Sequence, residues 1–517
     1  FKMPNKSVIT ILFFCWLVNV SHAQHFSINP IVGAVTNNSA KVLFLSEKQD
    51  AKFFISIKNE SENTFVCEFK NTKGTFVAQL DALNSNSQYR YSIFEKSKLD
   101  SSTFLVSGSF KTFPLQHDTT AFSFTLGSCT EQHYNDSIFV EMSKQQPLFF
   151  LHLGDWLYAN NFNERPFYYV ENINHQRELY RKRYEMPNLK NMRHTTPMDF
   201  IFDDEDGVYD DFSKKTYSEL KMSGSKTSIQ EIPYPDSLRQ IAIEGLHTFF
   251  PSYPTNKNQA YHSFVCGNAE IFFLDTRSTR SPNTESFHLA KSGRWKYKVP
   301  KGHTILDSAQ MNWLLQGLKD SKSTWKFIVS GVTFNQSYKK VLDITLRAQK
   351  RILPNGMNGA YVAASLASMW FAFPESQIKL LNFCRDNNIK NVIVLSGDAH
   401  TAAIDNGKNA GFPELMAGGL AQKNSKLAAI IKNNLRLNLW NQGGQGIGNK
   451  NFNDAYGKVT IHGDNYITLS AIDKFGTIIC TYDLQNGFIP KYYKLKPQKR
   501  ILKIRALKNL LKIALHQ

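Results

Sequence analysis

The feature that most constrains the fold is a series of five short apolar runs, each of which ends directly in a cluster of polar residues. The runs lie at residues 122–126, 147–153, 198–202, 269–274 and 391–395. Short apolar runs of this kind are typical of buried strands. Because stretches with helical patterns lie between them, the sequence predicts an α/β sheet, in which ligands bind at the carboxyl ends of the strands. The polar clusters at those ends are therefore the candidate functional residues.

Three further stretches support the α/β prediction. Asp307 and Gln310 have the spacing of a capping box ahead of an apolar stripe, which predicts the start of a helix. Pro374 opens a second predicted helix that ends near residue 388, and residues 325–330 predict another buried strand. The glycine-rich stretch 443–448 has no strand before it and no clear helix after it, so it is interpreted as a loop and not as a nucleotide-binding turn.

Residues 25–113 predict a separate β-sandwich domain, which we interpret as a structural or docking module. Six short apolar or alternating stretches are separated by turns rich in Asn, Ser and Lys, a pattern typical of a sandwich. The predicted strands are 41–45, 52–57, 65–69, 75–80, 89–94 and 108–113.

The N-terminal residues 1–23 predict a secretory signal peptide. Lys6 precedes an apolar segment at residues 8–20, and Ser21, His22 and Ala23 form a small-x-small cleavage signal. A membrane anchor is the alternative, but the apolar segment is shorter than the roughly 18–20 residues that cross a bilayer. We therefore expect an exported protein, either periplasmic or extracellular.

The C-terminal residues 491–517 predict a basic amphipathic helix. The chain carries 61 Lys and Arg against 43 Asp and Glu, and the tail contains nine of these cations and no acid. Its apolar residues recur at helical spacing. The tail would either adsorb to an anionic membrane or cell-wall surface, or dock on the rest of the protein with its lysines in water. Specific nucleic-acid binding is not expected, because aromatic stacking residues are not interleaved with the cations.

The third apolar run leads into the densest acidic cluster of the chain. Seven carboxylates fall within residues 199–211 with no basic residue among them, namely Asp199, Asp203, Asp204, Glu205, Asp206, Asp210 and Asp211. A solvated acidic loop is one interpretation. However, the cluster directly follows a predicted core strand, and carboxylates crowded at a sheet edge repel one another unless cations are present. Metal binding is therefore the favoured interpretation.

Other candidate ligands follow the remaining runs. Asp155 and Tyr158 are three residues apart, Asp398 and His400 are two apart, and Cys129 ends its own strand. A set with phenolate, carboxylate and imidazole suits Fe(III), oxygen ligands alone suit Ca²⁺, Mg²⁺ or Mn²⁺, and a Cys, His and Asp subset can take Zn²⁺. Taken singly, Cys129 and Tyr158 could equally be packing residues.

The motifs taken together resemble a known family. In order they are Gly127-Ser128-Cys129, Gly154-Asp155-Trp156-Leu157-Tyr158, Asp203-Asp204, Leu274-Asp275-Thr276-Arg277 and Leu395-Ser396-Gly397-Asp398-Ala399-His400. This order resembles the PhoD-like alkaline phosphatase D family, within the calcineurin-like and purple-acid-phosphatase-like metallophosphoesterases. The resemblance covers roughly residues 25–485. It implies a four-layer αββα catalytic domain at 121–485, preceded by an Ig/fibronectin-like β-sandwich.

The resemblance also implies roles for individual residues. Cys129, Asp155 and Tyr158 would be ligands, with the cysteine and the tyrosine on iron. Asp204, with Asp203 beside it, would hold neighbouring divalent ions such as calcium, and Asp398 and His400 would complete the cluster. Arg277 is expected either to contact phosphate or to pair with Asp275, and Asp275 is expected to be structural.

One position departs from the family pattern. The family usually has Asp-Asp-His followed by an acid, whereas the third position here is Glu205. A glutamate could bind a metal, or act as a general acid if its pKa is raised. An imidazole could come instead from one of four other histidines, His194, His247, His262 or His303.

The sequence therefore predicts an exported phosphoesterase. Metal ions would bind the phosphate oxygens of a phosphomonoester or phosphodiester and activate a water for in-line attack. The substitution at Glu205 leaves two alternatives open, a catalytically silent protein that binds metal and phosphate, or a surface-adhesion protein.

Overall fold

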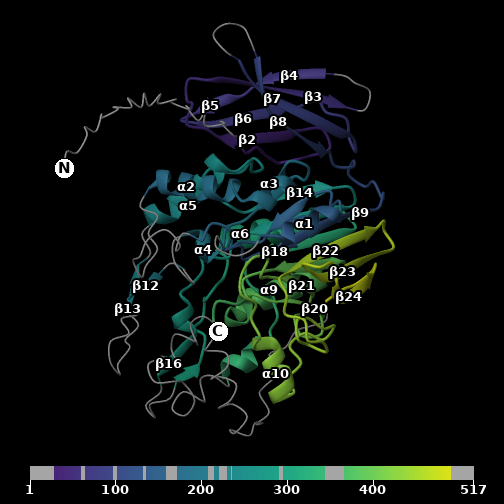
Figure 1. Cartoon of the computed structure of the whole chain (residues 1–517). Coiled ribbons are helices and arrows are strands. Elements are labelled where there is room, and N and C mark those ends of the chain that lie inside the picture. The colour runs from purple at the N-terminus through teal and green to yellow at the C-terminus, as the bar shows by residue number, and fades with distance from the viewer. Residues whose placement is uncertain are drawn as a thin grey trace, which may run out of the picture.

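The computed structural model describes residues 28–59, 64–96, 102–131, 136–158, 172–207, 213, 215–219, 230–233, 236–289, 295–343 and 366–490 (Figure 1). The predicted signal peptide and the predicted basic tail lie outside these residues, so both stay predictions. Within the described residues, no helix has the length and apolar character needed to cross a bilayer.

The N-terminal part consists of two antiparallel four-stranded sheets, in the orders β1-β2-β6-β5 and β4-β3-β7-β8. Aromatic side chains from both sheets meet between them, as in the edge-to-face contact of Phe44 with Phe53 at 5.1 Å. This confirms the predicted β-sandwich, while the domain boundaries stay predictions. The strands are β1 (Ile31–Gly33), β2 (Ala40–Leu45), β3 (Lys52–Asn59), β4 (Thr64–Glu68), β5 (Lys70–Thr72), β6 (Thr75–Leu80), β7 (Gln88–Lys96) and β8 (Ser102–Lys111).

The sandwich rests on helices of the following part, as Figure 1 shows. Buried Arg193 at the end of α3 (Pro187–Arg193) donates to the carbonyl oxygen of Pro30 at 2.9 Å. Arg177 of α2 (Ile173–Tyr184) donates to the carbonyl oxygen of Ser46 at 3.0 Å. The hydroxyl of Tyr253 donates to the carbonyl oxygen of Val35 at 2.6 Å. These hydrogen bonds, from side chains to backbone carbonyl groups, hold the sandwich against the following part of the chain.

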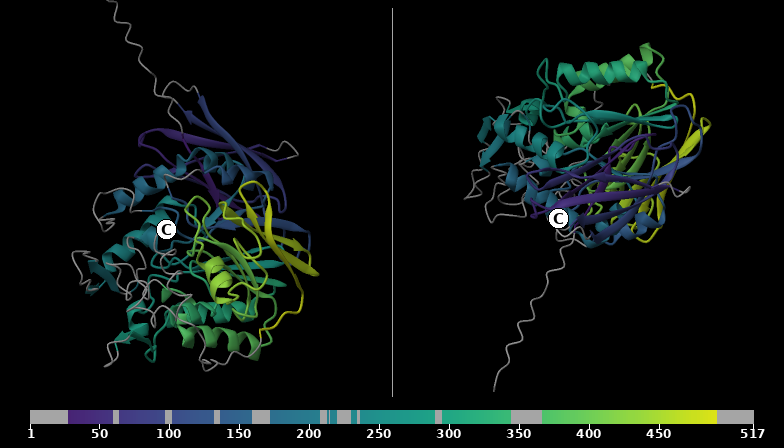
Figure 2. Two further views of the ribbon diagram at one scale, coloured as in Figure 1. Left: turned by 60° about the horizontal axis from the view of Figure 1, so that its bottom comes forward. Right: turned by 90° about the horizontal axis from the view of Figure 1, so that it is seen from above.

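Two six-stranded mixed sheets form the rest of the core. The first has the order β11-β10-β9-β22-β23-β24, and the second has the order β14-β15-β18-β19-β21-β20. The first sheet contains β9 (Phe122–Gly127), β10 (Phe150–His152), β11 (Met198–Phe200), β22 (Ala455–His462), β23 (Tyr466–Asp473) and β24 (Ile478–Gln485). The second contains β14 (His262–Cys266), β15 (Ala269–Leu274), β18 (Trp325–Ser330), β19 (Val392–Ser396), β20 (Ala402–Asn406) and β21 (Pro413–Ala417). The yellow strands β22 to β24 run along one side of the molecule in both views of Figure 2.

Alternate side chains of the second sheet belong to two different cores. Ile271 and Phe273 of β15 join the core shared with the first sheet, whereas Phe272 and Leu274 join a core with the outer helices. Phe124 of β9 meets Phe327 of β18 edge to face at 5.4 Å, which places the two sheets face to face. Because both faces of these strands are buried, their sequences are continuous apolar runs.

Helices cover the outer face of each sheet, which agrees with the predicted αββα layers. On the second sheet, α6 begins where predicted: Asp307 caps it by accepting from the backbone nitrogen of Gln310 at 2.8 Å. The Gln310 amide bonds the backbone of Asp275 instead of completing a capping box. The main helices are α1 (Ile138–Lys144), α2 (Ile173–Tyr184), α3 (Pro187–Arg193), α4 (Asp204–Gly207), α5 (Asp236–Phe249), α6 (Ser308–Asp320), α9 (Pro374–Asp386) and α10 (Leu427–Leu435).

The remaining described elements are short. They are β12 (Lys215–Glu219) paired with β13 (Gln230–Pro233), β16 (Phe287–Leu289) paired with β17 (Trp295–Tyr297), and the 3₁₀ turns at Asn283–Ser286 and Trp370–Ala372. The stretch 443–448 is a loop, as interpreted, and Gly444 forms an isolated bridge with Ala403 of β20.

The five predicted runs are the strands β9, β10, β11, β15 and β19. The sequence did not show that they divide between two sheets. β9, β10 and β11 are parallel neighbours in the first sheet, and β15 and β19 flank β18 in the second. Since the sheets face each other, the carboxyl ends of both sets meet, and the site is built there.

Candidate metal centre

Five of the predicted ligands have left-handed backbone conformations. Their φ angles are 64° for Cys129, 57° for Asp155, 45° for Tyr158, 67° for Asp398 and 46° for His400. A non-glycine residue at positive φ is uncommon and costs free energy, so a concentration of such residues is a mark of a functional site. All five lie in the turns that follow β9, β10 and β19.

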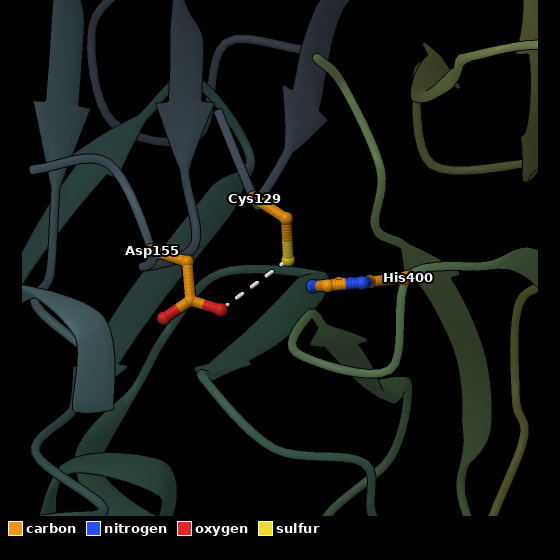
Figure 3. A group of neighbouring side chains, drawn as sticks. All are labelled: Cys129, Asp155 and His400. Atoms are coloured by element: carbon orange, nitrogen blue, oxygen red, sulfur yellow. Dashed lines mark hydrogen bonds between the residues drawn. The ribbon is translucent and has the colours of Figure 1, made fainter. Parts of the chain in front are cut away.

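The structure brings the predicted ligands into two donor groups. Cys129, Asp155 and His400 offer ligand atoms within 4.8 Å of one another, and Figure 3 shows them converging from opposite sides. Asp155, Asp203, Asp204 and Asp398 offer a second set within the same limit. Asp155 belongs to both groups. A shared carboxylate between two adjacent donor groups is the arrangement that holds two neighbouring metal ions.

The acidic ligands resist ionisation without a cation nearby. Burial raises the pKa of the Cys129 thiol to about 11. Burial and the neighbouring Asp204 carboxylate raise the pKa of Asp155 well above its usual range, and burial raises that of Tyr158. A metal ion would offset these costs by stabilising the charged forms.

Arg277 lies behind the carboxylates. Its guanidinium is fully buried and makes a bidentate pair with Asp203, while one of its nitrogens lies 3.2 Å from Asp204 and 3.0 Å from Asp398. It is not among the residues that line the cavity described below. The phosphate contact expected of Arg277 therefore stays a prediction. Asp275 accepts the backbone N–H groups of Arg277 and Ser278, in line with its expected structural role.

The acidic run separates into residues with different partners. Asp203 and Asp204 enter the second donor group. Asp199 instead accepts a hydrogen bond from His262 Nε2 at 2.8 Å, and Asp206 accepts hydrogen bonds from backbone N–H groups of the Asp155 turn. Asp210 and Asp211 lie outside the described residues.

A cavity of about 400 Å³ opens onto the donor groups. Tyr158 and Glu205 both line it, and the phenol oxygen of Tyr158 accepts from Gln422 at 3.4 Å. Thr401 also borders the cavity, and its buried hydroxyl has no hydrogen-bond partner in the described part of the chain. The described lining comprises Glu131, Asp155, Tyr158, Asp204, Glu205, Tyr338, Leu366, Met369, Asp398, Ala399, His400, Thr401, Gln422, Ser425, Leu427 and Ala428.

Sequence reasoning missed several of these lining residues. Glu131 follows Cys129 by two positions and could have been found from its place after the first run. Gln422 and Ser425 carry no sequence signal, because they come from a segment that follows β21 and holds none of the motifs. Thr401 directly follows His400 and could have been found from that position. None of the four alternative histidines lines the described cavity: His262 pairs with Asp199, and His247 bonds the carbonyl oxygen of Gln259.

Two glycines permit the close approach of Asp203. Gly154 has a φ of 104°, and a Cβ built on it would lie 2.4 Å from the Asp203 Cβ. A Cβ on Gly331 would lie 2.4 Å from Asp203 Oδ1. Only glycine fits both positions, so the backbones after β10 and β18 close around this carboxylate.

Comparison with known families identifies the architecture. A model of the family described as PhoD-like phosphatase matches residues 124–480, which is well over half of the chain. The chain belongs to the PhoD-like phosphatase family. The match includes every predicted site residue, from Cys129 in its first turn to His400 after β19.

Individual relatives of this PhoD-like chain are distant. Alkaline phosphatase D of Bacillus subtilis (strain 168) is 23% identical over 303 residues, which cover 55% of this chain and 46% of the relative. The chain thus spans about half the length of the curated relative it matches.

Two solved structures have the same fold. A structure described as that of PhoD is 17% identical, with a TM-score of 0.63, and the alignment covers 90% of this chain and 94% of that one. The purple acid phosphatase PPD1 of yellow lupin (Lupinus luteus) is 12% identical, with a TM-score of 0.54, and the alignment covers 88% and 74%.

Proposed function

We propose that this protein is an exported metal-dependent phosphoesterase that hydrolyses phosphate monoesters or diesters. Family membership supports a phosphatase. The observation that carries the proposal is the shared Asp155, which links two donor groups beside one cavity.

The chemistry of the donors fits two kinds of cation. The first group joins a thiol and an imidazole to a carboxylate, and the Tyr158 phenol lies beside it, a set that suits Fe(III) and also permits Zn²⁺. The second group has carboxylate oxygens only, which suits Ca²⁺, Mg²⁺ or Mn²⁺. We therefore propose Fe(III) and Ca²⁺. Cations at the two positions would supply positive charge for the phosphoryl oxygens and activate a water for attack.

The chain's own residues would orient and protonate the substrate. Arg277 fixes Asp203 in place and offsets the negative charge of the carboxylates around it. Glu205 lines the cavity together with Tyr158, and in its protonated form it would donate that proton to the leaving oxygen. The Thr401 hydroxyl would donate a hydrogen bond to a bound phosphate.

Export and surface association form the remaining parts of the proposal. The segment 1–23 supports secretion to the periplasm or the extracellular space. The basic residues of 491–517 support attraction to an anionic membrane or cell-wall surface. Deleting 491–517 is expected to release the protein from anionic vesicles without changing hydrolysis.

Elemental analysis of the purified protein, paired with assays on aryl phosphate monoesters and diesters under iron and calcium supply, tests the proposal. We expect bound metal, turnover, and a visible charge-transfer band that Tyr158→Phe removes. Absence of bound metal, together with unchanged behaviour of Cys129→Ala and Asp155→Ala, would refute the metal centre. Bound metal and phosphate without turnover would favour the silent binding protein.

A further inference from the structure

Asp206 stands out among the buried carboxylates because the hydrogen bonds that its carboxylate accepts in the described structure come from backbone N–H groups. The residue is 1% exposed. One carboxylate oxygen accepts from Trp156 N at 2.7 Å and Leu157 N at 2.5 Å. The other oxygen accepts from Asp155 N at 2.7 Å and from Asp203 N at 2.9 Å.

These four N–H groups belong to two separate loops, and each loop carries candidate metal ligands. Three consecutive N–H groups come from the turn after β10, which carries Asp155 and Tyr158. The fourth comes from Asp203, at the start of the acidic loop after β11. Asp206 is thus the single side chain in the described structure that bonds the backbones of both loops at residues 155 and 203.

The shape of the turn explains why a carboxylate is needed. Gly154 and Asp155 have φ angles of 104° and 57°, which turn successive N–H groups toward one point. Such a concave set of N–H groups attracts an anion. The two oxygens of an aspartate can accept all four bonds, whereas the amide of an asparagine would present an NH₂ group to two N–H donors.

We propose that Asp206 is a positioning residue that sets the separation of Asp155 from Asp203 and Asp204, and thereby the metal affinity of the second donor group. The inference rests on the proposed metal-dependent function. It assigns a task to a carboxylate that neither donor group contains, although Asp206 is only two positions from Asp204. The α4 helix, Asp204–Gly207, places the ligand and the positioning residue on one short turn.

Asp206→Asn tests the inference against a matched control, Asp199→Asn. Both parent residues are buried carboxylates of the same run, but Asp199 bonds His262 and offers no atom to either donor group. Ca²⁺ and Mn²⁺ affinities are measured by calorimetry on full-length protein freed of metal, alongside the unfolding temperature in chelator. We expect Asp206→Asn to weaken metal affinity about 10–100-fold, as loss of outer-sphere partners does, and Asp199→Asn to leave it unchanged.

A purely structural role predicts a different result. In that case both variants would lower the unfolding temperature of the metal-free protein while Asp206→Asn kept the parent's metal affinity, and this result would overturn the inference. If Asp206→Asn does not fold, Asp206→Glu keeps the charge with one more methylene. That variant should also bind metal more weakly, and parental affinity would again contradict the proposal.

The same measurements separate this inference from the proposed function. A parent protein that binds metal but turns over no phosphate ester would refute the phosphoesterase proposal. The comparison of metal affinities between Asp206→Asn and Asp199→Asn would still decide the role of Asp206. Conversely, full turnover with unchanged affinity in Asp206→Asn would refute only the positioning role.

Discussion

The two parts of the acidic run differ in what surrounds their carboxylates. Asp199 and Asp206 find partners within the protein, the former in His262 and the latter in four backbone N–H groups. Asp203 and Asp204 meet Asp155 and Asp398, and Arg277 is the one cation whose ion pairs with this group are described. Neighbouring acids in the sequence therefore have different surroundings: the first pair has its partners within the fold, and the second adds to a concentration of negative charge.

The largest effect is expected where the two donor groups share a ligand. Asp155→Ala should remove both metal ions and lower kcat/KM by about a thousandfold or more, because metal ions stabilise the transition state by several kcal/mol. Cys129→Ser changes a ligand of the first group only, so it should reduce binding of the proposed iron and spare the proposed calcium. Elemental analysis of both variants checks the comparison. Equal loss of both metals from Cys129→Ser would show that the groups do not bind separately.

A substitution at Glu205 should lower the rate of hydrolysis and leave the content of bound metal unchanged. It lines the cavity but belongs to neither donor group. Glu205→Gln is expected to lower kcat about 100-fold for alkyl phosphate esters, which need a proton on the leaving oxygen, and far less for p-nitrophenyl esters. Steady-state assays on both substrate types measure this difference. Equal losses on both would argue against a general acid, and loss of bound metal would make Glu205 a ligand.

A substitution at Arg277 tests whether this residue balances the charge of the carboxylates or binds phosphate. Arg277→Lys keeps the charge but loses the bidentate contact to Asp203. We expect metal affinity to fall about 10–100-fold, as for other partners of metal ligands, and inhibition by inorganic phosphate at saturating metal to stay close to that of the parent. Weakened phosphate inhibition with unchanged metal affinity would instead support the phosphate contact that the family resemblance suggests.

The strands and the ligand turns could be predicted from sequence because each apolar run ends at a polar cluster. The five runs are strands, and the two predicted helices start at Asp307 and Pro374 as expected. The division of the strands between two sheets could not be predicted, since β9 and β19 are both buried on two faces and have the same local pattern. Pairing between strands depends on contacts distant along the chain.

The roles within the acidic run were also beyond sequence reasoning. Asp203 and Asp206 are both aspartates that follow the same strand, yet one faces Arg277 and the other faces backbone N–H groups. That difference arises from the three-dimensional fold of the turn after β10, where Asp155 adopts a positive φ. The residues Gln422 and Ser425 reach the cavity from a loop with no distinctive composition.

The smallest effect is expected at Asp199, the first residue of the acidic run, which pairs with His262. Burial alone would lower the pKa of His262, but the Asp199 carboxylate reverses this and raises it. A histidine with a raised pKa in the folded state stabilises the protein fully below its unfolded pKa, near 6.5, and loses this contribution as pH rises through the folded value. Unfolding temperatures measured from pH 5.5 to 8.5 should therefore show a larger decrease for the parent than for Asp199→Asn, whose stability at the acidic end should be lower by roughly 1–3 kcal/mol. Parallel pH profiles would show that His262 stays neutral, and that the acidic run has no ionic partner at this end.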